Sequence, residues 1–101
     1  MNKSEIYEHA NKVLLLLKFS KGAKSRKIIL KSLCLKPKNC NQIAKESKLE
    51  WWTVQKHLEV LMKENLIISV RFGRIKFYKI TPKGEKALTE IFSSQKPTSQ
   101  S

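Results

Sequence analysis

The spacing of the apolar residues changes twice along this chain, and that pattern limits what the chain can fold into. Up to residue 64 the apolar side chains recur at helical spacing, between residues 68 and 80 they alternate with polar ones, and from residue 81 the helical spacing returns. The pattern predicts four helices, one β-hairpin and a last helix. We therefore expect an α+β protein that is mainly α, and its 101 residues have room for one domain.

Capping signals mark where three of these helices begin. Ser25 precedes the second helix and is its expected N-cap. Asn39 has Gln42 three residues later, which is the pattern of a capping box. Thr81 is followed by Pro82, a residue favoured at the first helical position. The expected helices span residues 2–19, 26–35, 40–47, 51–64 and 81–92.

The alternating segment predicts a short β-hairpin. Ile68, Val70 and Phe72 alternate with polar residues in its first strand, a glycine allows the turn, and residues 74–80 alternate again. Two residues of the second strand are expected to point inward, Tyr78 and Ile80.

The second half of the first helix is apolar nearly all round. Leu15 and Leu16 fall on or beside the face that Glu5 and Glu8 begin. A small domain cannot cover such a helix from one side, so either a second chain covers it or these leucines are exposed. We expect a homodimer in which the first and last helices form the interface. Its expected residues are Val13, Leu14, Leu16, Leu17, Leu88 and Ile91.

The charge balance points to a polyanionic partner. Lys and Arg number 21 and the acidic residues 8, all of them Glu, so the formal charge is +13. Such an excess favours nucleic acid first and an anionic membrane second. No carboxylate occurs between Glu8 and Glu46, which is typical of a surface that faces phosphates, whereas a general enrichment in lysine would not remove glutamate. The residues expected to contact phosphate are Arg26, Lys38, Asn39 and Asn41.

Three stretches of the chain resemble one family of regulators. Residues 39–49 (NCNQIAKESKL) look like the second helix and turn of a winged helix-turn-helix domain, and residues 51–61 (WWTVQKHLEVL) look like its recognition helix. Residues 78–84 (YKITPKG) look like the end of its wing and the start of its last helix. The chain is most similar to small prokaryotic and archaeal regulators of the arsenic-repressor and multiple-antibiotic-resistance-repressor type. It departs from the metal-sensing members, because residues 48–52 hold no Cys-rich motif.

The resemblance implies a division of the chain. Residues 1–92 would form a winged helix-turn-helix domain with an extra N-terminal helix and a C-terminal helix flanking the core. The parts are the N-terminal helix at 2–19, the winged-helix core at 25–80 and the C-terminal helix at 81–92. Residues 93–101 contain no apolar side chain and predict a disordered tail.

Two groups of residues are expected to touch DNA. Around the fourth helix, the buried stripe of Val54, Leu58 and Leu61 leaves Trp52 and Lys56 facing most nearly away. Glutamine suits adenine, lysine suits guanine or phosphate, and arginine suits a narrow minor groove. The expected contacts are Trp51, Trp52, Thr53, Gln55 and Lys56 on the recognition helix and Arg71, Arg74 and Lys76 on the wing.

Each of these assignments has a plainer alternative. The tryptophans, Trp51 above all, would instead pack in or beside the core. Thr53 would form a local hydrogen bond within its helix. The wing arginines would form a solvated basic turn. His57 we expect to be a packed histidine rather than a ligand.

Several classes of protein are excluded. The longest unbroken apolar run, Val13–Leu17, is too short to cross a membrane or to form a signal-peptide core, so we expect a cytoplasmic protein. No catalytic constellation or Gly-rich phosphate loop is recognisable, so we expect neither an enzyme nor a cofactor. Cys34 and Cys40 lack zinc-site spacing; free buried thiols are expected, a disulfide is the alternative, and no metal is expected.

The sequence thus predicts a DNA-binding transcriptional regulator. It would act as a homodimer on double-stranded DNA, with its recognition helix in the major groove and its wing at the minor groove. One alternative is a sequence-tolerant nucleoid or architectural DNA-binding protein, or an RNA-binding protein, which the charge alone would also allow. Another is a winged-helix module that binds protein through Trp52.

Overall fold

A computed structural model of the chain describes residues 12–95, with side chains up to residue 91. Residues 2–11 of the predicted first helix and residues 96–101 of the predicted tail lie outside this range. The described elements are η1 (Leu15–Phe19), α2 (Ala23–Leu35), β1 (Lys38–Asn39), α3 (Cys40–Ser47), α4 (Trp51–Lys63), β2 (Ile67–Phe72), β3 (Ile75–Ile80) and α5 (Pro82–Gln95).

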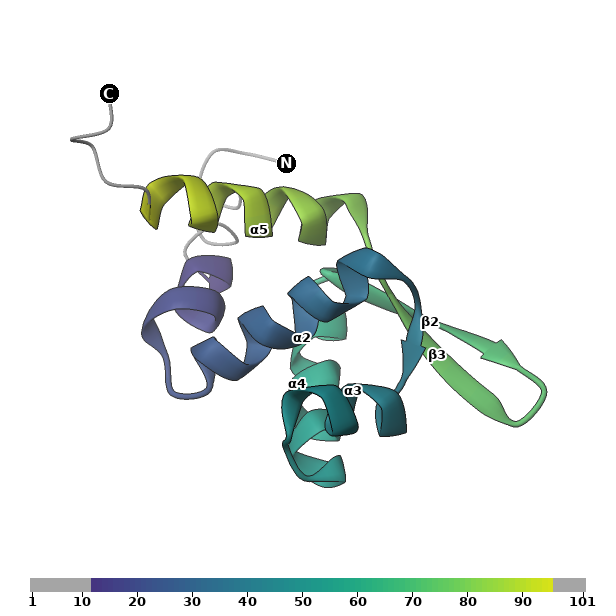
Figure 1. Ribbon diagram of the computed structural model, residues 1–101. Helices are drawn as coiled ribbons and strands as arrows, with labels where there is room; N and C mark the ends of the chain where they lie inside the picture. Colours follow the sequence, from purple (N-terminus) through teal and green to yellow (C-terminus); the bar gives the residue numbers. More distant parts are fainter. Residues whose placement is uncertain (1–11, 96–101) are drawn as a thin grey trace.

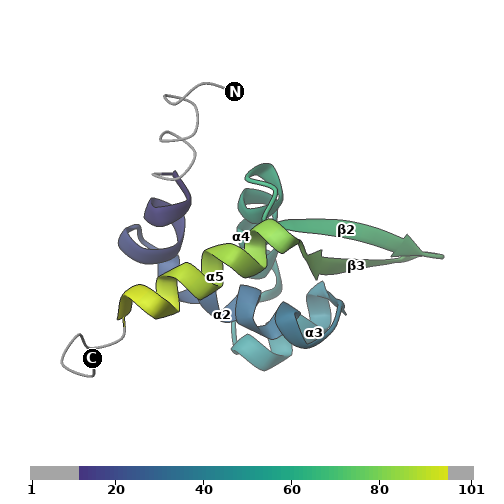
Figure 2. The ribbon, with the colours of Figure 1, turned by 90° about the horizontal axis from the view of Figure 1, so that it is seen from above.

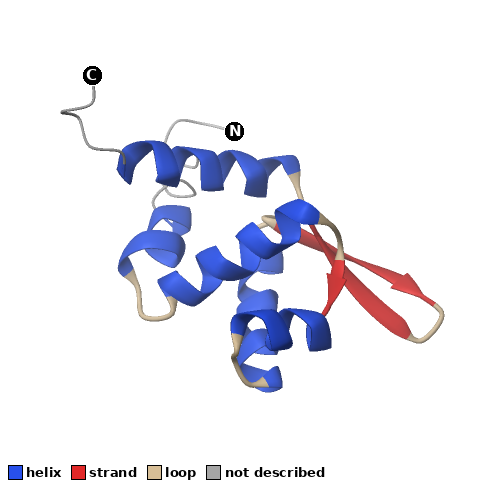
Figure 3. Cartoon of the chain, viewed as in Figure 1, coloured by secondary structure: helices blue, strands red, loops and turns tan. Residues whose placement is uncertain are grey.

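The helices form one body from which a hairpin projects. In Figure 1, α5 lies along one side of α2, and α3 and α4 lie on the other, while β2 and β3 extend away from all of them. Figure 2, seen from above, also shows β2 and β3 extending away from the helices. The α+β architecture expected from the sequence, mainly α with one hairpin, is confirmed (Figure 3).

The core lies where α2, α4 and α5 meet the inner end of the hairpin. The stripe expected on α4 is confirmed, because Val54, Leu58 and Leu61 are fully buried. Tyr78 and Ile80 of β3 point inward, also as expected. The other buried apolar residues are Leu17, Ala23, Ile29, Leu30, Leu33, Cys40, Ile43, Leu66, Ile67, Ala87, Leu88 and Ile91.

Two of the predicted caps are present. The Asn39 side chain accepts a hydrogen bond from the Gln42 backbone N–H at 2.8 Å, and the Gln42 side chain accepts one from the Asn39 N–H at 2.9 Å. This capping box orients α3. At α5 the Thr81 hydroxyl accepts a hydrogen bond from the Gly84 N–H at 3.0 Å. A side chain at Gly84 would collide with the backbone carbonyl oxygen of Leu66, so α5 begins directly against the loop before β2.

Two helix boundaries and one short strand differ from the prediction. The second helix begins at Ala23 rather than residue 26, and its N-cap is Gly22, at a φ of 88°, rather than Ser25. The last helix continues to Gln95, so the first three residues of the predicted tail are helical. The two-residue strand β1 was not predicted, because its only partner is β3, far away in sequence.

The sheet has the order β1-β3-β2 and is antiparallel throughout. The register gives the hairpin two faces, since residues opposite each other across two strands share a face. The face that we call the inner face carries Ile67, Ser69, Arg71, Lys76, Tyr78 and Ile80. The face that we call the outer face carries Ile68, Val70, Phe72, Ile75, Phe77 and Lys79.

Candidate nucleic-acid interface

One hollow lies between the start of α4 and the β2–β3 hairpin, which we call the wing. The start of α3 closes its third side. Its lining brings together residues from all three groups expected at DNA, namely the recognition helix, the wing and the phosphate contacts. The lining residues are Asn39, Cys40, Asn41, Trp51, Gln55, Arg74, Ile75, Lys76 and Tyr78.

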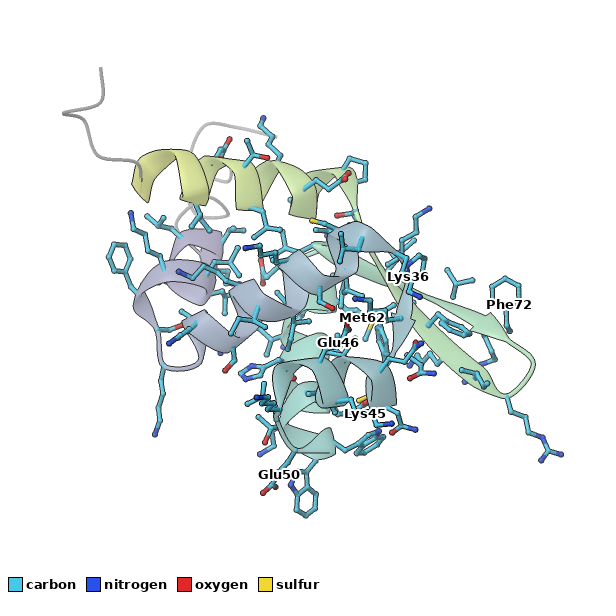
Figure 4. All side chains as sticks on the ribbon, in the orientation of Figure 1. Lys36, Lys45, Glu46, Glu50, Met62 and Phe72 are labelled. Carbon is cyan, nitrogen blue, oxygen red and sulfur yellow. The ribbon has the colours of Figure 1, made fainter. Side chains whose placement is uncertain are left out.

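Both tryptophans lie at the exposed N-terminal end of α4. Trp51 is 53% exposed and Trp52 is 66% exposed, so neither belongs to the buried core, although Trp51 lies beside Cys40 and Tyr78 in the lining of the hollow. The Trp52 indole N–H donates a hydrogen bond to a carboxylate oxygen of Glu50 at 2.6 Å. Glu50, labelled in Figure 4, is the residue before the helix, so this contact holds the indole at the helix end.

Gln55 is less free than the sequence predicts. Its side chain is half-buried and lies beside Tyr78 of β3 in the lining of the hollow. Burial raises the pKa of Tyr78, and the neighbouring Gln55 side chain acts in the opposite direction. Lys56, the next residue, is exposed, and Thr53 is half-buried. The recognition helix and the inner face of the wing are therefore linked through one pair of side chains.

The wing presents basic side chains on one face and at its tip. Arg71 and Lys76 lie opposite each other in the register of the inner face, and both are exposed. The ammonium of Lys76 lies 5.8 Å from the centre of the Tyr78 ring. Gly73 has a φ of 59°, which suits the tight turn that places Arg74 at the tip.

The expected phosphate contact of Lys38 is wrong. Lys38 is only 3% exposed. Its ammonium donates hydrogen bonds to Glu46 at 2.9 Å and to the Ser32 hydroxyl at 2.8 Å. The bonds from Lys38 and Ser32 lower the pKa of Glu46. A buried ammonium needs such partners, so Lys38 fastens β1 to α2 and α3 instead of meeting DNA.

Arg26, also expected to contact phosphate, is half-buried and bonded within the protomer, and its phosphate contact stays a prediction. One terminal nitrogen of its guanidinium donates to the Leu16 carbonyl oxygen at 2.8 Å and to the Ser20 hydroxyl at 2.9 Å. Its Nε is buried with no hydrogen-bond partner in the described part of the chain. Burial lowers the pKa of Arg26. Arg26 therefore ties η1 to α2.

His57 packs at the same junction, in agreement with the expectation of a packed histidine. A Cβ at Gly22 would come within 2.9 Å of the His57 ring. Burial lowers the pKa of His57, and the neighbouring charge of Arg26 lowers it further.

The residues expected at a dimer interface fall into two groups. Leu17, Leu88 and Ile91 are buried inside the protomer, because η1 and α5 pack their apolar sides onto α2. Val13 and Leu16 are partly buried against the same core. Leu14 is exposed. The large apolar side chains exposed near it on the first helix are Leu15 and Phe19, of which Phe19 was not named from the sequence.

Both cysteines of the chain lie within the described residues. Cys34 and Cys40 are free; Cys40 is buried as expected, whereas Cys34 is exposed. Burial raises the pKa of both thiols.

Between residues 12 and 95 no His, Cys or Glu side chains cluster as a metal site would require. Within the same span no helix has the length and apolar character needed to cross a bilayer.

The fold matches those of known regulators. A homodimeric winged helix-turn-helix DNA-binding domain from Mycobacterium bovis, described as a possible ArsR-family transcriptional regulator, is 21% identical with a TM-score of 0.72 over 92% of this chain and 85% of that chain. The regulator BldR from Sulfolobus solfataricus is 24% identical with a TM-score of 0.65 over 87% and 63% of the two chains. A zinc-responsive MarR family member from Lactococcus lactis is 19% identical with a TM-score of 0.64 over 90% and 74%. At these identities the likeness concerns the fold.

A sequence profile identifies the family to which the chain belongs. No curated protein sequence matches the chain. The family profile described as winged helix-turn-helix matches residues 27–98, well over half of the chain. The resemblance noted in the sequence, to regulators of the arsenic-repressor and multiple-antibiotic-resistance-repressor type, agrees with this match and with the structural neighbours. The chain belongs to the winged helix-turn-helix family.

Proposed function

We propose that this protein is a sequence-specific, double-stranded DNA-binding transcriptional regulator that acts as a homodimer. The observation that carries the proposal is the hollow between α4 and the wing, where exposed aromatic and basic side chains converge from α4 and β3. The chain would work by binding rather than by catalysis. Its net charge of +13 supports a polyanionic ligand.

In this proposal α4 enters the major groove with its N-terminal turns. Trp52 and Lys56 are exposed there and meet base edges or the sugar backbone. The amide of Gln55, which lies beside Tyr78, has hydrogen-bonding capacity for a base and reads it from a fixed position. Arg71 and Arg74 reach the minor groove or its phosphates from the wing.

The start of α3 supplies phosphate contacts in place of Lys38. Asn41 is exposed. The side-chain oxygen of Asn39 accepts a hydrogen bond from the backbone N–H of Gln42. The side-chain N–H groups of Asn39 therefore remain to donate to a phosphate oxygen. The N-terminal end of a helix also favours an anion.

The homodimer would form through the exposed apolar residues of the N-terminal helix. Leu14, Leu15 and Phe19 lie there, and the Mycobacterium bovis relative with the same fold is homodimeric. We expect Leu15→Glu combined with Phe19→Glu to produce a folded monomer in sedimentation velocity experiments. Lys21→Glu, an exposed charge change in the adjacent turn, is the matched control and should remain dimeric. A wild-type protein that sediments as a monomer at tens of micromolar would refute the dimer.

Sequence specificity is tested by selecting bound DNA from a random pool and comparing the winner with random DNA. We expect a large affinity ratio between the two at physiological salt. Gln55→Ala or Lys56→Ala should cost about 1–3 kcal/mol on the selected DNA and little on random DNA. If both variants lose random DNA equally, or no sequence is enriched, the sequence-tolerant nucleoid-type function is the better account.

A further inference from the structure

The outer face of the wing carries an apolar hollow that shares only Ile75 with the lining of the hollow at the proposed DNA interface. It is lined by Pro37, Val70, Phe72, Ile75, Phe77 and Lys79. Phe72 is 70% exposed and Ile75 is 50% exposed. The rings of Phe72 and Phe77 meet edge to face with their centres 6.0 Å apart, which makes them one wall of the hollow. A contiguous apolar surface of this kind on a small protein marks an interaction site.

The hollow faces away from the proposed DNA side of the wing. Its residues alternate along β2 and β3 with Arg71 and Lys76, which belong to the inner face. In Figure 4 the labelled Phe72 stands off the hairpin, well away from Glu50 at the start of α4. A wing that contacts DNA with its inner face and tip therefore leaves this hollow open.

The charged residue in the lining of the hollow is basic. Residues 65–84, which include both strands of the hairpin, contain no acidic residue. Lys79 is part of the lining, and the exposed Lys36 directly precedes Pro37. Nearby, Glu46 is paired with Lys38. An occupant of the hollow therefore has to combine an apolar anchor with negative charge.

These constraints select among occupants. A second copy of this chain packed through the same face would set Lys79 against another basic hairpin, because residues 65–84 contain no acidic residue. A flat lipid surface would not fill a hollow with an aromatic wall. A protein segment with one large apolar side chain flanked by carboxylates fits both the shape and the charge.

We propose that the outer face of the wing is a docking site for an acidic segment of another protein. One leucine or aromatic side chain of that segment enters the hollow beside Phe72 and Phe77, and its carboxylates lie against Lys36 and Lys79. The proposal does not depend on DNA binding, and because it is tested without DNA, its failure is distinct from failure of the proposed function.

The test is selection of a random-peptide library displayed on phage against the immobilised full-length protein. We expect enriched peptides to share a large apolar residue flanked by Asp or Glu. Synthetic versions of these peptides, measured by fluorescence anisotropy, should lose affinity by about tenfold or more in Phe72→Ser and in Ile75→Ser. Lys79→Glu should weaken them by a few-fold, most strongly at low salt. Ser69→Ala, an exposed change on the inner face of the same strand, is the matched control and should bind like wild type.

The melting temperatures of Phe72→Ser and Ile75→Ser should stay near that of wild type, because both side chains are exposed, and this excludes unfolding as the cause of lost binding. Three results would overturn the proposal: no enriched peptide, enriched peptides without acidic residues, or equal binding by Phe72→Ser. Binding to phosphatidylserine-containing vesicles without peptide binding would assign the face to a membrane. Self-association that Phe72→Ser abolishes would assign it to a second copy of the chain.

Discussion

The two faces of the β2–β3 hairpin share the same strands and the same alternation, yet they differ in almost every physical respect. On the inner face, Ile67 and Tyr78 are buried under the helices, and basic side chains follow toward the tip. On the outer face, Ile68, Val70, Phe72 and Ile75 are exposed. The difference comes from the neighbours, because the strand residues that belong to the buried core, Ile67, Tyr78 and Ile80, all lie on the inner face. Alternation in a sequence thus separates two faces of a strand but does not say which face is covered.

The largest expected difference between the two faces is in the loss of stability when an isoleucine on each face is truncated. Ile67 is 1% exposed and Ile68 is 48% exposed. Ile67→Ala removes a fully packed side chain and should lower the free energy of unfolding by about 2–5 kcal/mol. Ile68→Ala should lower it by less than about 1 kcal/mol. Urea denaturation followed by circular dichroism measures both, and equal losses would mean that the register described here is wrong.

A second test separates the faces by what they bind. Arg71→Ala combined with Arg74→Ala should weaken selected and random DNA together by about tenfold or more. The slope of log affinity against log salt should become shallower by about one unit per lost phosphate contact. Phe72→Ser, between them in sequence but on the outer face, should leave both quantities unchanged. Titrations at two salt concentrations decide, and a loss of DNA affinity in Phe72→Ser would join the outer face to the DNA site.

A smaller effect tests the link between the inner face and α4. Tyr78→Phe removes the hydroxyl beside the Gln55 side chain. Since one hydrogen bond contributes about 1 kcal/mol, we expect the affinity for selected DNA to fall by no more than that amount. Random DNA should be bound as before. Unchanged discrimination between the two DNAs would show that Gln55 does not depend on the wing for its position.

The smallest expected effect is a pH dependence that belongs to the helical body and not to the hairpin. The folded-state pKa of His57 is lowered by burial and by Arg26, so the unfolded chain binds a proton more readily than the folded one. Stability is therefore complete above the unfolded pKa of about 6.5 and declines as the pH falls below it. His57→Gln should reduce the loss of stability measured by urea unfolding between pH 7 and about pH 5.5. Residues 65–84 contain no His or acidic residue, so Phe72→Ser should keep the wild-type pH dependence.

The features that sequence reasoning predicted correctly depend on near neighbours in the chain. The capping box of Asn39 and Gln42 is complete within four residues, and the buried stripe of α4 repeats within one helix. The features it missed depend on partners in other secondary-structure elements, six to ten residues away in the cases of Arg26 and Lys38. Nothing near Lys38 or Arg26 in the sequence shows that one will meet Glu46 and the other the Leu16 carbonyl. Both were assigned to phosphate because a basic residue in an acid-free stretch has no visible partner until the chain is folded.

The same dependence on distant neighbours limits what the sequence predicts for the residues of the dimer interface and of the wing. An amphipathic pattern identifies Leu17 and Leu88 as apolar positions that need cover, but not whether the cover comes from α2 or from a second chain. The position of Phe72 in an alternating strand likewise predicts its face and not its exposure. Charge, in contrast, is read directly from composition, and the basic wing tip follows from Arg74 beside the turn glycine.

The contacts of Arg26 have a consequence for which substitutions the chain can accept. The chain uses eighteen lysines and only three arginines, and many of those lysines are interchangeable charges in water. Arg26 instead serves two acceptors on the N-terminal segment from a single planar group, with part of that group buried. A lysine there would keep the charge but present one compact ammonium on a differently shaped stem. The net charge of the chain would be unaffected by that exchange, while the attachment of the N-terminal helix to the rest of the protein would be loosened.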